Sequence, residues 1–168
     1  MRRYSQTITA TTATAATALL AFAMIASPPL VFADSPHFLI ASSSLSGSSL
    51  VCTFKEAGLG TAATNIRETC SAQATAVYEC VNNGGNHPQA VNKETVSGPV
   101  SGSNFFPIRG GQTTGMITVA APGPGNFACP GGQSLVLASV TYTNVMICDA
   151  LGNCAPMASQ TFRNPSAP

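Results

Sequence analysis

Residues 134–148 read SLVLASVTYTNVMIC, and they are the longest stretch of the chain that is rich in β-branched residues. Valine, threonine and isoleucine favour extended strands because their branched side chains pack well on a pleated sheet. Residues 49–55 (SLVCTFK) alternate strictly, so that Leu50, Cys52 and Phe54 point to one face of a strand. The two stretches together predict a sheet with one buried face.

The same pattern continues along most of the chain. Stretches rich in Gly, Pro and Asn separate short apolar runs, and beyond the N-terminal segment no run has the period of a helix. A turn is expected at residues 71–73 (SAQ), and Gly98-Pro99 predicts an edge position or a bulge in its strand. We expect about eight strands, over residues 38–43, 49–55, 65–70, 75–81, 93–101, 115–120, 134–148 and 155–162.

Strands without helices must bury their apolar faces against one another. The sequence therefore predicts an all-β fold, an immunoglobulin-like antiparallel β-sandwich stapled by disulfides, with a small β-barrel as the alternative. No repeat and no linker divides residues 34–168, which we expect to form a single domain.

The composition excludes several classes of protein. Among 168 residues there are 7 Lys and Arg against 6 Asp and Glu, and charged residues make up 8% of the chain. This is too little basic charge for a nucleic-acid-binding surface. A hydrophobic fraction of 45% also excludes a disordered tail.

The first 33 residues have the three parts of a secretory signal peptide. Arg2 and Arg3 form a basic start, residues 15–26 (AATALLAFAMIA) are apolar, and Val31 and Ala33 occupy the −3 and −1 positions of a cleavage site. The alternative is an uncleaved membrane anchor, but the apolar part is shorter than the roughly 20 residues that a bilayer requires. We expect cleavage after Ala33, secretion, and no membrane insertion of the mature chain.

All six cysteines lie in the part that we expect to be exported, which favours three disulfides. Cys148 and Cys154 bracket a tight turn, and Cys52 and Cys70 lie on sequential strands and can face each other. Cys80 and Cys129 are then left to form a long-range bond. The competing arrangement pairs Cys70 with Cys80 and Cys52 with Cys129.

Three stretches carry a resemblance to a known family. Residues 54–60 (FKEAGLG), 78–96 (YECVNNGGNHPQAVNKETV) and 129–145 (CPGGQSLVLASVTYTNV) resemble small exported proteins of actinobacteria and related soil bacteria. The resemblance covers most of the mature chain and implies export, a β-rich fold and no particular reaction. It also implies that Cys80 pairs with Cys129, and that the other four cysteines are additions that pair with one another.

No catalytic set is evident in the sequence. A Ser or Cys triad requires a His and a carboxylate, but the two histidines are His37 and His87, the two aspartates are Asp34 and Asp149, and no Gly-x-Ser-x-Gly occurs. A glycosidase requires two facing carboxylates. The available glutamates neighbour basic or polar residues, and we expect each to face solvent: Glu56, Glu68, Glu79 and Glu94.

We expect neither a metal nor another cofactor. The closest cysteines are separated by five residues and the two histidines by 50 positions, which does not fit a zinc site. Residues 149–153 (DALGN) contain a single carboxylate, too few for a tight calcium site, so they predict a hairpin closed by a disulfide.

The segment from residue 82 to residue 95 (NNGGNHPQAVNKET) is the richest in polar side chains that could bind a partner. Amides both donate and accept hydrogen bonds, and loops on a rigid sandwich commonly carry binding sites. The alternative is that the same side chains only satisfy the backbone of the loop. The candidate binding residues are Asn82, Asn83, Asn86, His87, Gln89, Asn92, Lys93 and Glu94.

Three functions remain open at this point. The first is an exported, non-enzymatic β-sandwich that binds an extracellular or cell-surface partner, whether protein or glycan. The second is a secreted carrier of a small apolar metabolite, and the third is an extracellular hydrolase whose site the sequence does not reveal.

We predict that the exported protein begins at Asp34, because Val31-Phe32-Ala33 fits the recognition pattern of signal peptidase. N-terminal sequencing of the protein from culture medium measures this directly. A secreted protein that begins at Met1 would contradict the prediction.

Overall fold

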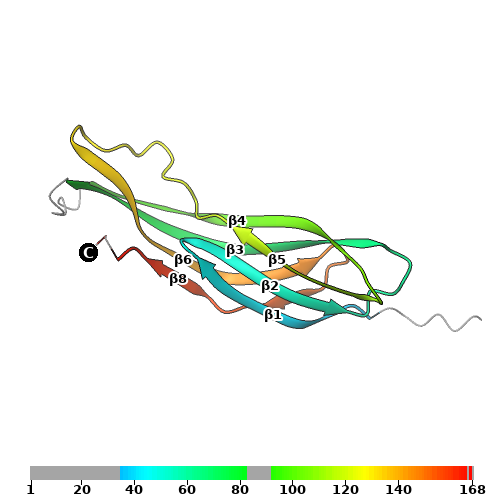
Figure 1. Ribbon diagram of the computed structural model, residues 1–168. Helices are drawn as coiled ribbons and strands as arrows, with labels where there is room; N and C mark the ends of the chain where they lie inside the picture. The colour runs from blue at the N-terminus through cyan, green and yellow to red at the C-terminus, as the bar shows by residue number, and fades with distance from the viewer. Residues whose placement is uncertain (1–34, 83–91, 166, 168) are drawn as a thin grey trace, which may run out of the picture. The chain divides into compact units, whose positions relative to one another are not determined.

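The computed structural model describes residues 35–82, 92–165 and 167, and Ala33–Pro168 form one compact unit. Eight strands follow one another along this part of the chain (Figure 1). They are β1 (His37–Ser46), β2 (Ser49–Ala57), β3 (Asn65–Asn82), β4 (Lys93–Pro107), β5 (Gln112–Val119), β6 (Gln133–Asp149), β7 (Cys154–Pro156) and β8 (Gln160–Arg163).

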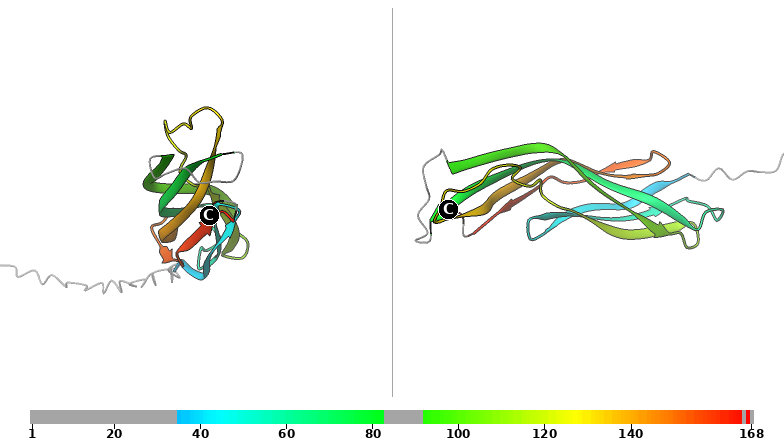
Figure 2. Two further views of the ribbon diagram at one scale, coloured as in Figure 1. Left: turned by 90° about the vertical axis from the view of Figure 1, so that its left-hand side faces the viewer. Right: turned by 90° about the horizontal axis from the view of Figure 1, so that it is seen from above.

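The strands form two antiparallel sheets. One has three strands in the order β1-β2-β5, and the other has five, in the order β4-β3-β6-β7 with β8 also paired to β6. Figure 2 shows the sheets as two layers. The prediction of an all-β, disulfide-stapled sandwich is confirmed, and in the described residues the two sheets remain separate and do not close into one barrel.

Two local predictions for the five-stranded sheet need comment. The expected turn at residues 71–73 is wrong, because β3 runs unbroken through them for 18 residues. The small residues Ala72, Ala74 and Ala76 alternate inward there, and the irregularity is taken up as a register shift against β6. The edge position predicted from Gly98-Pro99 is confirmed, since among the described strands β4 pairs only with β3, although β4 continues through both residues.

The core lies between the sheets and follows from the alternation in the sequence. Leu50, Cys52 and Phe54 of β2 are buried, as predicted, and they face the inward side chains of β3 and β6. Tyr142 of β6 is fully buried, and its hydroxyl donates a hydrogen bond to the Ser48 carbonyl oxygen at 2.7 Å. A buried tyrosine needs such a partner, so this bond fixes the β1–β2 turn to the core.

Three disulfides join these elements, and all six cysteines are used. Cys52–Cys70 connects β2 to β3 and therefore links the two sheets through the core. Cys80–Cys129 fixes the end of β3 to the β5–β6 connection. Cys148–Cys154 closes the β6–β7 hairpin. The expected pairing is thus confirmed, and the competing arrangement with Cys70–Cys80 is wrong.

At one end of the core, aromatic rings pack against a glycine. Phe54 and Phe106 meet edge to face, with ring centroids 4.9 Å apart. Gly115 of β5 lies directly under the Phe106 ring, so a β-carbon at this position would come within 2.2 Å of a ring atom. Only the absence of a side chain at residue 115 allows this contact between the sheets.

We predict that Gly115→Ala destabilises the protein by about 1–3 kcal/mol, because the Phe106 ring must leave its place against Phe54. Urea unfolding followed by circular dichroism measures the change. Gly131→Ala is the matched control, since a β-carbon there meets no atom within 4 Å. Equal stability of the two variants would contradict the packing described.

Candidate functional site

The binding segment expected from the sequence lies only partly in the described structure. Asn83, Asn86, His87 and Gln89 are outside the described residues. Asn82 ends β3 and is exposed, Asn92 immediately precedes β4, and Lys93 and Glu94 begin β4.

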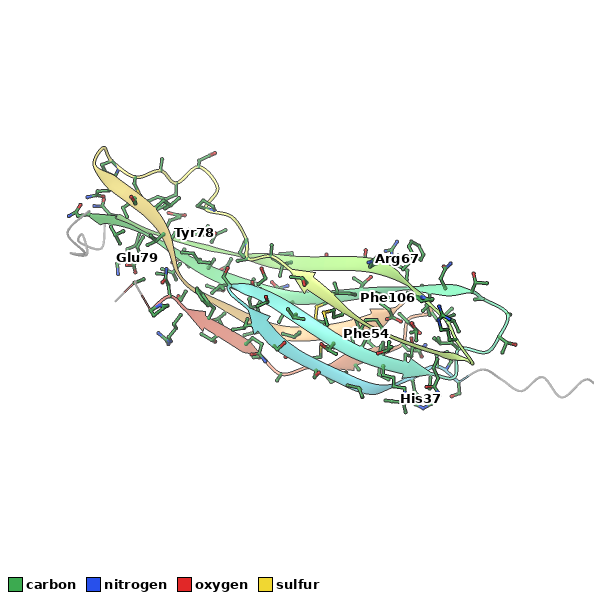
Figure 3. The ribbon with its side chains drawn as sticks, viewed as in Figure 1. His37, Phe54, Arg67, Tyr78, Glu79 and Phe106 are labelled. Atoms are coloured by element: carbon green, nitrogen blue, oxygen red, sulfur yellow. A yellow bond between two sulfur atoms is a disulfide. The ribbon has the colours of Figure 1, made fainter. Side chains whose placement is uncertain are left out.

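Lys93 has a structural contact. Its Nζ lies 2.8 Å from Oε1 of Glu79, which is 5% exposed, and the two residues are directly opposite in the β3–β4 register. Figure 3 labels Glu79 at this end of the molecule. Lys93 therefore helps to hold the ends of β3 and β4 together. Its part in a binding surface stays a prediction.

Two contacts hold the end of β3 in place beside this segment. Besides the Cys80–Cys129 disulfide, the Tyr78 hydroxyl donates to the carbonyl oxygen of Pro122 at 2.8 Å. Both contacts hold the β5–β6 connection, which is yellow in Figure 1, beside the ends of β3 and β6. These two contacts provide the rigid support that was expected for the segment after residue 82.

The glutamates do not lie where the sequence predicted. Glu94 is exposed as expected, but Glu56 and Glu68 are both 0% exposed and Glu79 is also buried, so the expectation of solvent-facing charge is wrong for these three. The physical reason is strand parity. Glu56 is two residues from Phe54 and Glu68 is two residues from Cys70, so each shares the inward face of its strand.

The buried glutamates meet across the two sheets and form an acidic cluster, which we define as Glu56, Glu68 and Asp149. Glu56 comes from the three-stranded sheet, while Glu68 and Asp149 are directly opposite each other in the β3–β6 pairing. The Glu56 carboxyl group is in hydrogen-bonding contact with both of the others. Thr113, also buried, lies opposite Glu56 in the β2–β5 register.

This contact requires a proton. Ionised carboxylates only accept hydrogen bonds, and as ionised groups all four side-chain oxygens of Glu56 and Glu68 are buried without a donor. Burial, together with the contacts to Glu68 and Asp149, raises the pKa of Glu56 to about 9. A protonated Glu56 becomes the donor of the cluster, and burial raises the pKa of Glu68 as well.

Asp149 has a different role. Burial acts to raise the pKa of its carboxyl group, but hydrogen bonds from Asn153, Glu56 and Leu151 outweigh burial and lower the pKa. Its Oδ1 accepts from the backbone nitrogens of Leu151 and Asn153 at 2.9 and 2.7 Å, and its Oδ2 accepts from Asn153 Nδ2 at 2.7 Å. The ionised carboxylate therefore holds the disulfide-closed hairpin that the sequence predicted.

The two glutamates of the acidic cluster are closed off from solvent. Glu56 and Glu68 converge as the two carboxylates of a glycosidase would, but neither reaches the surface. Within the described ranges, no set of three or more His, Cys, Asp or Glu residues is arranged to hold a metal ion.

The surface at the end of the sandwich that contains the acidic cluster has exposed apolar side chains. Phe105 and Leu151 are 64% and 68% exposed, and they flank an apolar hollow of about 230 Å³ whose inner wall includes Leu59 and Ile66. Arg67, directly opposite Phe105 in the β3–β4 register, lines this hollow and an adjoining one of about 500 Å³. Figure 3 shows Arg67 at the end opposite to Tyr78 and Glu79.

We call Arg67, Phe105 and Leu151 with their hollow the end groove. The sequence analysis missed it because its walls come from the β2–β3 loop, the start of β3, the end of β4 and the β6–β7 turn, which only the topology brings together. The strand predicted over residues 93–101 ends before Phe105, whereas β4 continues to Pro107, so strand parity could not be used to predict that Phe105 is exposed.

Comparisons with known proteins add little. No protein-family model matches the chain, and no curated protein matches it. Among solved structures, the chain is similar to Spo0M, a sporulation control protein from Bacillus subtilis, at 14% identity and a TM-score of 0.22. The match covers 77% of this chain and 46% of that one, so this chain spans about half the length of the structure it matches. A similarity at this level supports no argument.

Two findings bear on the compartment. The three disulfides indicate that the chain folds in an oxidising environment. In the part of the chain that the structure describes, no helix has the length and apolar character needed to cross a bilayer.

We predict that the protein becomes less stable as the pH rises from 5 to 8.5. The pKa of Glu56 is about 9 in the fold against an ordinary value of 4.5, so the fold favours the protonated group. Its stabilising effect is complete below pH 4.5 and is lost as the pH rises through 9, with a slope of up to about 1.4 kcal/mol per pH unit. The lowered pKa of Asp149 has the opposite effect on stability, because it stabilises the fold as the pH rises. This effect is fully present once the pH reaches 5, since the ordinary pKa of the group is 3.8.

Urea unfolding at several pH values tests this, with Glu56→Gln as the variant. A glutamine side chain cannot ionise, so the slope should decrease and the variant should be more stable than the wild type at pH 8. Glu94→Gln, at an exposed site, should retain the wild-type slope. If Glu56→Gln has an unchanged pH profile, the proton assigned to the acidic cluster is wrong.

Proposed function

We propose that the chain is an exported, non-enzymatic protein with an immunoglobulin-like β-sandwich that binds an extracellular or cell-surface partner. Export is supported by the signal-peptide pattern of residues 1–33, with cleavage after Ala33, and by the three disulfides. The immunoglobulin-like description is supported by two hairpins in different sheets, β1–β2 and β3–β4, to which β5 and β6 then return.

One observation carries the binding role, namely the end groove. Phe105 and Leu151 are among the most exposed large hydrophobic side chains of the described residues, and both lie beside an apolar hollow; exposed apolar patches of this kind mark interaction sites. The groove also has a rigid mount, since Cys148–Cys154 closes the turn that carries Leu151 and Cys52–Cys70 fixes the strand that carries Arg67. A preorganised surface loses less entropy when a partner binds.

The other two functions have less support. A hydrolase would need the converging Glu56 and Glu68 to reach a substrate, and both are sealed in the core. A carrier of an apolar metabolite would need an enclosing cavity of roughly 300–1,000 Å³. The apolar hollow of about 230 Å³ is smaller than this and is walled partly by exposed side chains.

We expect the double variant Phe105→Ser with Leu151→Ser to lose retention on the cell wall and secreted material of the producing organism. Both side chains are exposed, so their loss removes apolar contact area without opening the core. The measurement compares the fraction of purified protein that sediments with the wall or is captured from culture medium.

Leu135→Ser is the matched control, because Leu135 is 38% exposed at the opposite end of β6, where it pairs with Cys80. This variant should be retained like the wild type. If the double variant is retained like the wild type, the end groove is not the binding site.

A further inference from the structure

We propose that the end groove binds an acidic, apolar segment of a partner protein, with an apolar side chain in the hollow beside Phe105 and carboxylates at Arg67 and the neighbouring cations. The inference rests on the proposed function and specifies the chemistry of the partner. It is drawn from how charge and apolar surface are distributed around this one end of the sandwich.

The first argument is the charge at the surface. Lys55 and Arg109 line a hollow of about 330 Å³ formed with Pro107, and Ile108, which lies between Pro107 and Arg109 in the chain, lines the end groove, so residues 107–109 contribute to both hollows. Among the described residues, no ion pair is found for Lys55, Arg67 or Arg109. Arg67 therefore lines the apolar hollow, and Lys55 and Arg109 line the neighbouring one, with no ion pair to any of the three in the part of the chain that the structure describes.

The second argument is the position of the acidic residues at this end. Glu56, Glu68 and Asp149 are the nearby described carboxyl groups, and all three are directed into the core or the turn. Asp149 also lines the hollow of about 500 Å³ together with Arg67, but its oxygens accept three hydrogen bonds from Leu151 and Asn153. No carboxylate of the described residues lines the hollow that Lys55 and Arg109 share. An anionic partner supplies the missing counter-charge, and electrostatic complementarity favours it over a neutral or basic one.

The third argument is the shape and lining of the hollow. Phe105, Leu151 and the buried Leu59 and Ile66 make it apolar, and its volume of about 230 Å³ suits an inserted side chain. A purely charged polymer would leave this surface unfilled, and a purely apolar segment would leave Arg67 without a partner. Apolar anchors next to an arginine are typical of the centre of a protein interface.

The test uses the purified, disulfide-bonded protein and three probes at low salt. One is a capped peptide of alternating leucine and glutamate, the second is the same peptide with glutamine in place of glutamate, and the third is poly-glutamate. Binding is measured by titration calorimetry and by NMR shift changes. We expect the leucine–glutamate peptide to bind about tenfold more tightly than either other probe, and to weaken as salt is added.

Variants assign the binding to the groove. Arg67→Gln and Phe105→Ser should each weaken the leucine–glutamate peptide about tenfold, whereas Arg67→Lys should lose less because it retains the charge. Arg163→Gln and Leu135→Ser, which alter a cation and an apolar residue in the half of β8 and β6 that lies away from the groove, should bind like the wild type. Circular dichroism confirms that each variant is folded.

Each other result overturns the inference. Equal binding of the glutamine peptide would remove the role of the cations, and equal binding of poly-glutamate would indicate a general polyanion site. If no probe binds but cell-wall retention still depends on Phe105 and Leu151, the chemistry assigned to the partner is wrong and the proposed function stands. If retention is also independent of these residues, both the inference about the partner and the proposed function are wrong.

Discussion

The antiparallel pairing of β3 with β6 is the constraint on which the other described elements depend. β3 carries β4 on its other edge, β6 carries both β7 and β8, and Cys52–Cys70 attaches the three-stranded sheet to the same ladder. An 18-residue strand paired with a 17-residue strand is long enough to support separate surfaces at its two ends. The site at residue 82 and the end groove both owe their rigidity to it.

Much of this fold could be predicted from the sequence because strand parity is a strong physical signal. The alternation that placed Leu50, Cys52 and Phe54 on one face of a strand is the one the structure has, and that face is buried in the sandwich. The same parity, continued by one step, places Glu56 inside as well. Glu56 was nevertheless expected at the surface, because a charged side chain normally faces water, and only a proton shared within the acidic cluster makes its burial tolerable.

The candidate site was less predictable for a different reason. The polar residues around residue 82 are consecutive in sequence and therefore easy to find, whereas the end groove combines Leu59, Arg67, Phe105 and Leu151 from four segments. None of these residues is unusual within its own segment. Their proximity depends on which strands pair and in which register, and the alternation of single strands does not determine either.

The disulfide-closed turn between Cys148 and Cys154 has a consequence for resistance to proteolysis. Proteases attack protruding turns first. If a protease cuts the chain within residues 149–153, the two new ends remain joined through Cys148–Cys154, and β7 stays covalently attached to β6. A nick at the most exposed apolar residue of the end groove would therefore leave the sandwich in one piece.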